Sequence, residues 1–358
     1  MVFEKFQDVE LPASFDAHVH LRDGAMSNLV VPTIRQGGVN TVYVMPNLVP
    51  PITTVQQALD YRARLQALEP NVIYLMSLYL HESITPNVIK AAKKAGITGV
   101  KSYPAGVTTN SSSGVVDYTL FYPVFAELEA QNMILNLHGE SPSGDDITVL
   151  NAEAGFLPTL RELHARFPRL RIILEHCTTA AAIATVLALG PTVAGTLTAH
   201  HLYITVDDWA GDPFCFCKPV AKTPADRDAL LRAAASGNPK FFLGTDSAPH
   251  PATAKRGGDR IAAGVFTQPY ATQLVLGALE EGVERGVVKE GEVTMEVLEG
   301  FLSGFGRRFY GVEDKTGETI VLRKGGEEVI GLLTKEGLEV EVVPFRRGEK
   351  CWSVEWKG

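Results

Sequence analysis

Residues 72–78 read VIYLMSL, a run that is apolar at nearly every position. A strand with one face in water alternates polar and apolar residues, whereas a strand buried on both faces does not. Comparable β-rich runs recur along the chain, and each ends in polar residues. The runs are 15–20, 41–47, 72–78, 99–103, 133–139, 171–177, 192–199 and 240–246. They predict eight parallel strands that are covered on both faces.

Helical signals lie between these runs. Thr85 followed by Pro86 is typical of a helix start, and Gly96 marks the end of that helix. Thr54 and Gln57 have the spacing of a capping box before a long Ala, Leu and Arg stretch. Eight strands alternating with helices predict an α/β fold, a TIM-type (β/α)8 barrel. The alternative, an open doubly wound sheet, favours a glycine-rich phosphate turn after the first strand, and none is present.

The composition is that of a soluble globular enzyme, with 45% hydrophobic and 21% charged residues among 358. A net charge of -8 without any basic cluster argues against nucleic-acid binding. The most apolar helical stretch, 180–189, is too short to cross a membrane. Four cysteines without a C-x-x-C pair, and an N-terminus without the apolar region of a signal peptide, predict a cytoplasmic protein.

The chain changes character at about residue 311. Short strand-like runs follow, separated by glycine-rich turns, at 319–322, 328–333, 338–343 and 352–356. Trp352, Val354 and Trp356 alternate onto one strand face. We expect a barrel domain over residues 1–310 and a C-terminal β-rich extension, 311–358, that packs on the barrel.

Residues of metal-ligand type stand at the ends of the predicted strands. His18 and His20 form an H-x-H pair, which directs both imidazoles to the same side of a strand. Neutral imidazole is the commonest metal ligand. The other strand ends carry Asn47, Lys101, His138, His176 and Asp246. Because active sites of such barrels lie at the C-terminal ends of the strands, we expect these side chains to converge.

Four imidazoles and one carboxylate exceed the needs of a single zinc ion that keeps a position open for water. Two metals need a bridging group, and the ammonium of Lys101 has no lone pair. Capture of carbon dioxide would turn its nitrogen into a carbamate, whose two oxygens can join two cations. An ordinary lysine paired with Asp246 is the alternative that the sequence leaves open.

The stretches DAHVHLRDG, YVMPN, VKSYPAG, TTNSSSGV, NLHGE, LEHCTT and LGTDSAPH together resemble the amidohydrolase superfamily and, within it, the class II dihydroorotases. The resemblance runs from about Phe15 to Tyr270 and does not reach the C-terminal tail. It implies a zinc-dependent, reversible cyclisation of N-carbamoyl-L-aspartate to L-dihydroorotate and water in de novo pyrimidine (UMP) biosynthesis. It also suggests a homodimer.

The resemblance implies two Zn²⁺ per chain and a ligand set for each. The more buried zinc lies on His18, His20 and Asp246, and the second on His138 and His176. The lysine of the fourth strand bridges both as N6-carboxylysine. Asp246 is also the implied catalytic residue, because it carries the proton between the attacking water and the ring nitrogen.

Substrate contacts follow from the same resemblance. Arg22 can meet the dihydroorotate carboxylate bidentately, and Asn47 and His250 are two further carboxylate contacts. The other implied substrate contacts are His20 and the backbone groups near Lys218 and Ala263.

Residues 105–114 are rich in Gly, Thr and Ser, with few apolar atoms to pack firmly. The corresponding loop of class II enzymes closes over substrate, which implies loop contacts from Thr108 and Thr109. A flexible surface turn is the alternative.

Two other functions fit parts of the sequence. A hydantoinase or allantoinase would share the ligands, but usually adds a β-sandwich built from both termini, and too few residues precede Asp16. A catalytically silent scaffold would be expected to have lost ligands, and none is missing. His200 and His201, after the seventh run, are interpreted as structural, and Cys177 as a core residue.

Overall fold

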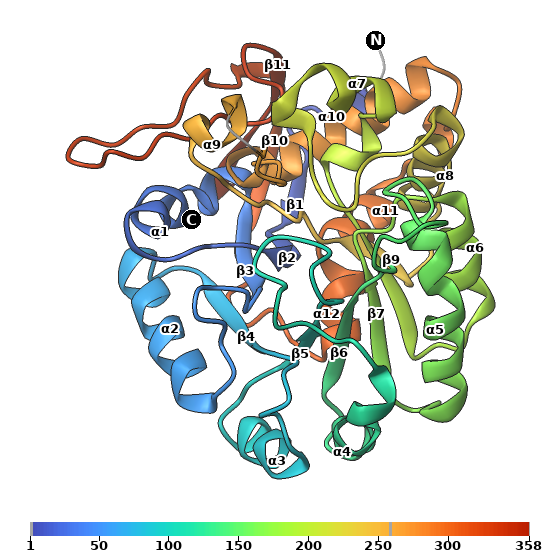
Figure 1. Cartoon of the computed structure of the whole chain (residues 1–358). Coiled ribbons are helices and arrows are strands. Elements are labelled where there is room, and N and C mark those ends of the chain that lie inside the picture. The colour runs from blue at the N-terminus through green and yellow to red at the C-terminus, as the bar shows by residue number, and fades with distance from the viewer. Residues whose placement is uncertain (1–2, 258–259, 358) are drawn as a thin grey trace.

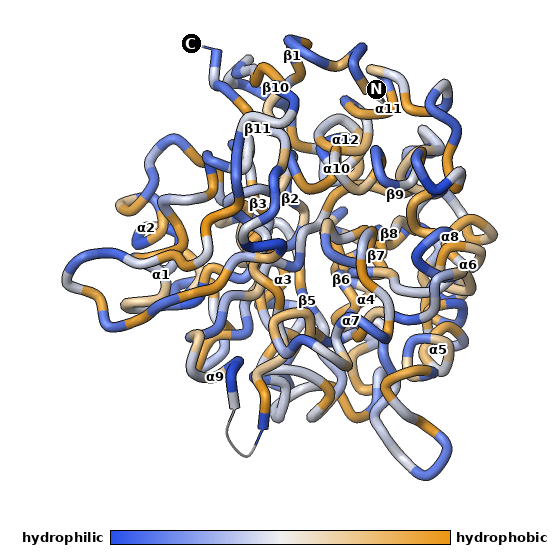
Figure 2. Tube along the Cα trace, turned by 90° about the horizontal axis from the view of Figure 1, so that it is seen from above, coloured by the Kyte–Doolittle hydropathy of each residue, from blue (hydrophilic) through white to orange (hydrophobic). Residues whose placement is uncertain are grey.

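A parallel eight-stranded barrel forms the centre of the computed structural model, which describes residues 3–257 and 260–357. Its strands follow one another in chain order and surround the barrel axis, with helices outside them (Figures 1 and 2). The strands are β2 (Ser14–Val19), β3 (Val39–Val44), β4 (Ile73–Tyr79), β5 (Gly99–Ser102), β6 (Ile134–His138), β7 (Arg171–Glu175), β8 (Val193–Leu197) and β9 (Phe241–Leu243). The predicted TIM-type fold is confirmed.

The first and last strands meet through residues that follow β9. The backbone N–H of Asp246 donates to the carbonyl of His18 at 2.8 Å, and that of His20 donates to the carbonyl of Ser247 at 3.0 Å. This closure brings the carboxylate of Asp246, which follows the last strand, beside the H-x-H pair of the first strand.

The helices begin where their capping residues predict. Thr85 accepts a hydrogen bond from the N–H of Val88, and Thr54 forms the expected capping box with Gln57. The α-helices are α1 (Gly24–Val30), α2 (Val55–Leu68), α3 (Pro86–Lys94), α4 (Tyr122–Ala130), α5 (Ala152–Arg166), α6 (Ala180–Ala188), α7 (Val206–Gly211), α8 (Pro224–Ala234), α9 (Ala252–Arg256), α10 (Ala271–Glu284), α11 (Met295–Glu299) and α12 (Phe305–Tyr310). Within the described ranges, every helix is too short or too polar to span a lipid bilayer.

Aromatic side chains fill the barrel near the start of its strands. The ring of Tyr310, from α12, packs edge-on against Phe15 at 5.2 Å and lies 5.0 Å from Tyr43, centroid to centroid. Asn136 donates to the Tyr310 hydroxyl at 2.9 Å. This end of the barrel is therefore packed, and chemistry is left to the opposite end, where the strands finish.

The tail forms part of a small antiparallel sheet. Strands β10 (Thr319–Glu328) and β11 (Lys350–Lys357) pair with each other, and β1 (Glu10–Pro12) pairs with the other edge of β10. Trp352 is buried, and Trp356 stacks on Arg35, so the expected shared face packs on the barrel. The sequence did not predict the contribution of β1.

Two of the four expected tail strands are absent from the structure as described. Residues 329–333 and 338–343 lie in the segment between β10 and β11, part of which projects from the molecule as a long loop (Figure 1). Among the described residues of this segment, Leu333 and Val342 form an isolated antiparallel bridge. Strand-like composition was misleading because the projecting segment has no sheet edge to join. The division of the chain at residue 310 stays a prediction.

Candidate active site

The ends of the barrel strands line a pocket with about 340 Å³ of space between its atoms. Most of the predicted site residues share this lining: His18, His20, Arg22, Asn47, Thr108, Thr109, His138, His176, Lys218, Asp246 and Ala263. His250 adjoins it through Arg22 and Ala263. Several of these residues lie beyond the strand ends, for example Asp246 after Leu243, the last residue of β9.

One group of three ligand-type residues is already assembled. An oxygen of Asp246 lies 3.3 Å from Nε2 of His18 and 3.1 Å from Nε2 of His20. All three side chains are buried, and their ligand atoms lie within 4.8 Å of one another. Two imidazoles and a carboxylate in this arrangement form a candidate metal site.

Hydrogen bonds behind the rings hold this pair of histidines in place. Nδ1 of His18 lies 2.8 Å from a carboxylate oxygen of Glu175, and Nδ1 of His20 lies 2.8 Å from the amide oxygen of Asn47. A proton on Nδ1 donates to these oxygens and leaves the lone pair of Nε2 facing Asp246. Such outer contacts orient metal ligands and raise their basicity.

Glu175 is a functional residue that the sequence reasoning missed. Its carboxylate also accepts hydrogen bonds from Asn136 and Thr196, at 2.5 and 2.6 Å. Burial opposes its ionisation, but the charges of His18 and Lys101 beside it hold its pKa at about 2. A lone acidic residue in the apolar run RIILEHC was the available signal, because a buried carboxylate needs cationic or hydrogen-bonding partners.

The later two histidines lie next to each other, with ring centroids 4.6 Å apart. Nε2 of His138 lies 2.8 Å from a carboxylate oxygen of Glu140, which leaves Nδ1 as its available ligand atom. Nδ1 of His176 is buried without a hydrogen-bond partner among the described residues. Burial holds the pKa of His176 well below its usual value, so this ring is neutral and can bind a cation.

Lys101 lies fully buried in β5, and its Nζ has no hydrogen-bond partner in the described part of the chain. The hydrogen-bonded ion pair with Asp246 that the sequence left open is therefore not formed. Burial lowers the pKa of Lys101 to about 8, against the opposing effect of Glu175 and Asp246. A buried amine with a lowered pKa and no hydrogen-bond partner is suited to react with carbon dioxide. The histidine nitrogens and the Asp246 carboxylate in the same pocket are suited to bind two metal ions.

The backbone is strained at three residues of the pocket. Positive φ angles occur at Arg22 (57°), His176 (42°) and Asp246 (47°). Each of these costs about 1–3 kcal/mol for a residue other than glycine and persists only where the surroundings impose it. The sequence offered no signal for this strain.

Two of the three predicted carboxylate-binding residues, Arg22 and His250, contact each other beside the pocket. Nε of Arg22 donates to the carbonyl of Pro249 at 3.0 Å, and its Nη2 lies 3.2 Å from Nε2 of His250. The same nitrogen of His250 lies 2.9 Å from the carbonyl of Ala263. Burial, and then the charge of Arg22, lowers the pKa of His250 to about 3, so its ring is neutral.

The loop 105–114 lies over the pocket. Asn47 donates to the carbonyl of Thr109 at 3.1 Å, and Asn110 donates to the carbonyl of Asn47 at 2.9 Å. Nζ of Lys218 donates to the carbonyl of Val107 at 2.9 Å. These contacts join the loop to two residues of the pocket wall, and Asn110 was not among the predicted residues.

The chain is similar over its full length to known enzymes. A sequence model of the Amidohydrolase family matches residues 9–317. Dihydroorotase of Saccharomyces cerevisiae is 46% identical, with 98% of this chain and 99% of that protein aligned, and the probable dihydroorotase of Schizosaccharomyces pombe is 50% identical with the same coverage. The crystal structure of the S. cerevisiae enzyme in complex with 5-fluoroorotic acid has a TM-score of 0.91 at 45% identity, covering 98% and 99% of the two chains.

This coverage corrects one expectation, because the similarity does not stop near Tyr270 but includes the tail. The pocket unites four histidines and the carboxylate of Asp246 at the mouth of a TIM-type barrel, and Lys101 is buried in the neighbouring strand β5. With these relatives, the assignment is direct: the chain belongs to the amidohydrolase family and, within it, to the dihydroorotases, hydrolases that act on a cyclic amide.

Proposed function

We propose that the chain catalyses the reversible cyclisation of N-carbamoyl-L-aspartate to L-dihydroorotate and water, in de novo pyrimidine biosynthesis. The observation that carries this proposal is the convergence of four histidines and Asp246 in one pocket above the buried Lys101. The ligand of the yeast structure, 5-fluoroorotic acid, is a pyrimidine carboxylic acid, and this supports the substrate class.

In this proposal the pocket holds two zinc ions. His18, His20 and Asp246 bind one, and His138 and His176 bind the other. The lysine of β5, once carboxylated on Nζ, would be a ligand that the two ions share. When bound, the two ions supply an activated water and polarise the amide carbonyl. Nζ of this lysine and Nδ1 of His176 support the assignment, since both are buried and have no hydrogen-bond partner among the described residues.

Asp246 moves the proton. In the metal-free chain, burial raises the pKa of its carboxyl group, against the opposing charges of His18 and Lys101. In hydrolysis, the oxygen of water adds to the ring carbonyl carbon and the C–N bond breaks. Asp246 carries the proton from that water to the released nitrogen. In cyclisation the same carboxyl group takes the proton from the ureido nitrogen and returns it to the departing water.

Arg22, Asn47 and His250 bind the substrate carboxylate. The guanidinium of Arg22 is held at Nε by the carbonyl of Pro249, and Nη2 lies beside His250, which orients its terminal N–H groups for contact with a carboxylate. The amide nitrogen of Asn47 donates to the loop carbonyl of Thr109 and can donate to a carboxylate beside it. A neutral His250 contributes a hydrogen bond without an added charge.

The remaining contacts recognise the ring and exclude water. We assign the backbone near Lys218 and Ala263 to the amide edges of the ring, and His20 to a further contact. Thr108 and Thr109 lie on the loop over the pocket and would contact the substrate from above. Exclusion of water by such a loop strengthens the charge-assisted hydrogen bonds beneath it.

We further propose that the protein is cytoplasmic and a homodimer. Four cysteines, none in a disulfide, support a reducing compartment. Light scattering coupled to size-exclusion chromatography measures the mass in solution, and a monomer at micromolar concentration would contradict the dimer.

The function is tested by following the ring opening of L-dihydroorotate, with hydantoin as the comparison. We expect a clear preference for dihydroorotate, because hydantoin has no carboxylate for Arg22. Metal analysis of the purified protein should find at least about two zinc ions per chain. A preference for hydantoin would favour the hydantoinase alternative, and a folded, metal-free and inactive protein would favour the scaffold.

A further inference from the structure

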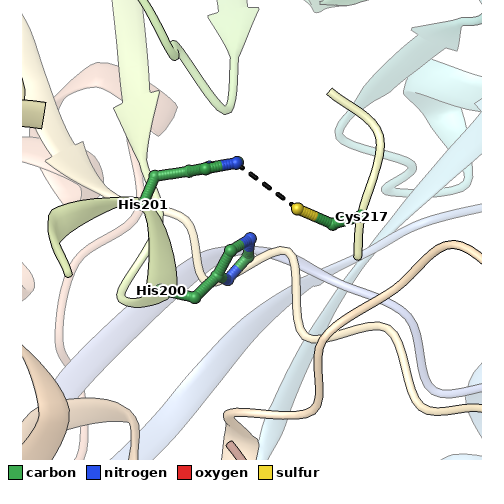
Figure 3. Close-up of side chains that lie close together, drawn as sticks. All are labelled: His200, His201 and Cys217. Atoms are coloured by element: carbon green, nitrogen blue, oxygen red, sulfur yellow. Dashed lines mark hydrogen bonds between the residues drawn. The ribbon is translucent and has the colours of Figure 1, made fainter. Parts of the chain in front are cut away.

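A second cluster of metal-ligand side chains lies outside the candidate active site, formed by His200, His201 and Cys217 (Figure 3). All three are buried, with exposed fractions of 0%, 1% and 1%. One ligand atom from each lies within 4.8 Å of the others. The function proposed above uses none of these side chains.

The cluster joins two separate parts of the chain. The two histidines belong to the short 3₁₀ helix η5 (His200–Leu202) after β8, and Cys217 follows a second 3₁₀ helix, η6 (Pro213–Cys215). Nε2 of His201 lies 3.5 Å from Sγ of Cys217. Two ligands on one tetrahedral zinc, with bonds of about 2.05 Å to nitrogen and 2.3 Å to sulfur, would lie about 3.5 Å apart. The observed spacing therefore needs little adjustment to accept an ion.

His200 supplies a second, independent observation. Both of its ring nitrogens are buried and have no hydrogen-bond partner among the residues that the structure describes. Leaving a buried polar atom without a hydrogen bond costs about 1–3 kcal/mol of stability. A metal ion bound to one ring nitrogen of His200 would remove part of this cost. In Figure 3 the ring of His200 points toward the gap between His201 and Cys217.

His201 is oriented for the same role. Its Nδ1 lies 2.9 Å from the hydroxyl of Thr198, and its Nε2 lies 3.1 Å from the carbonyl of Pro219. Because a carbonyl oxygen only accepts, Nε2 donates to Pro219 in the metal-free chain. An ion on Nε2 would require this proton to move to Nδ1, where the hydroxyl of Thr198 can accept it. The hydrogen bond of a metal-bound histidine through its other nitrogen is usually of this kind.

The protonation states fit a soft cation. Burial lowers the pKa of His201 to about 4 and that of His200 well below its usual value, so both rings are neutral ligands. Burial raises the pKa of the Cys217 thiol, against the opposing charges of Lys255 and Lys222. A metal ion deprotonates a coordinating thiol, which would release the proton now shared with the carbonyl of Pro219 at 3.2 Å.

We propose that His200, His201 and Cys217 bind a thiophilic divalent cation of the Zn²⁺ class through two imidazoles and one thiolate. The ion ties η5 to the segment that carries Lys218, whose Nζ holds the loop over the active site. It is a structural site, separate from the two ions assigned to catalysis.

The test uses the full chain, stripped of metal and reconstituted with Co²⁺ in a thiol-free reductant. Thiolate bound to Co²⁺ absorbs in the near ultraviolet by charge transfer, and the candidate active site holds no cysteine, so this band reports the cluster alone. We expect the band in the wild-type protein, and its loss together with one cobalt ion per chain in Cys217→Ser. Cys215→Ser, which changes a thiol two residues away, should keep both.

His200→Asn tests the same ion without altering the sulfur, and serves if Cys217→Ser does not fold. Loss of the band, with retained cobalt at the other positions, supports the proposal. A wild-type protein without the band at saturating Co²⁺, or a band that survives Cys217→Ser or His200→Asn, overturns it. In those cases the three side chains contribute to core packing and bind no metal ion.

Discussion

Lys101 should react with carbon dioxide far more readily than an exposed lysine at neutral pH. Only the neutral amine forms a carbamate, and burial lowers the pKa of this group from 10.5 to about 8. At pH 7 the neutral fraction then rises from about 0.03% to about 9%, roughly 300-fold. The expected consequence is that uptake of zinc by the metal-free chain depends on dissolved carbon dioxide.

The same pKa gives a stability signature in the metal-free, carbon-dioxide-free chain. Between pH 8 and pH 10.5 the unfolded chain holds a proton on Lys101 that the folded chain has lost, so the free energy of unfolding rises with pH. The full change is about 3 kcal/mol. Lys101→Met has a side chain of similar length without an amine, so its free energy of unfolding should lack the part of the increase that comes from Lys101. The difference between the two proteins in urea unfolding at pH 8 and at pH 10 measures this contribution.

Reconstitution with zinc, with and without bicarbonate, completes the assay, and ¹³C NMR with labelled bicarbonate detects the carbamate directly. Equal rates and amounts of zinc uptake with and without bicarbonate, combined with no carbamate signal, would refute the reasoning. So would a Lys101→Met protein with the same pH dependence of unfolding as the wild type.

The other predictions concern residues around the metals and substrate. Asp246→Asn should abolish turnover while substantial zinc remains, since the amide keeps an oxygen ligand but cannot carry a proton; wild-type activity would reject the proton role. Glu175→Gln should lower zinc affinity or activity about 10–100-fold by weakening the support of His18, and zinc titration of the metal-free protein that shows no change would contradict this. Arg22→Lys should raise the KM for dihydroorotate by about 10–100-fold, because one of two charged hydrogen bonds is lost; an unchanged KM would place the carboxylate elsewhere.

The barrel could be predicted because strands covered on both faces are apolar at consecutive positions, and all eight runs became strands. Their ends could not be predicted as well. Strand β9 ends at Leu243, whereas its predicted run continues to Asp246. A strand ends where its neighbour stops offering hydrogen bonds, and that depends on the partner strand. The four histidines and Asp246 that were predicted as ligands still line one pocket, since residue type and proximity to a strand end were enough to select them.

Contacts between distant segments were beyond the reach of sequence reasoning. The pairing of β1 with β10 joins residues about 310 positions apart, as in the register of Leu11 with Ile320. Likewise, the bond of Glu175 to His18 depends on which way a side chain points inside the closed barrel. Periodicity reports burial and face, but it does not report which buried groups meet.

The pocket brings together features that normally destabilise a fold. Positive φ angles at His176 and Asp246 lie beside a buried amine on Lys101 and an unpartnered ring nitrogen on His176. The apolar barrel around them supplies the stability that makes these costs tolerable. The two unpartnered nitrogens would gain partners from a cation or from carbon dioxide bound in the pocket, so binding would stabilise the folded chain there. The side chains of the site are therefore already in place in the ligand-free chain. Little of the binding free energy of the ligands is then needed to rearrange the protein, and most of it can stabilise the charges in the pocket.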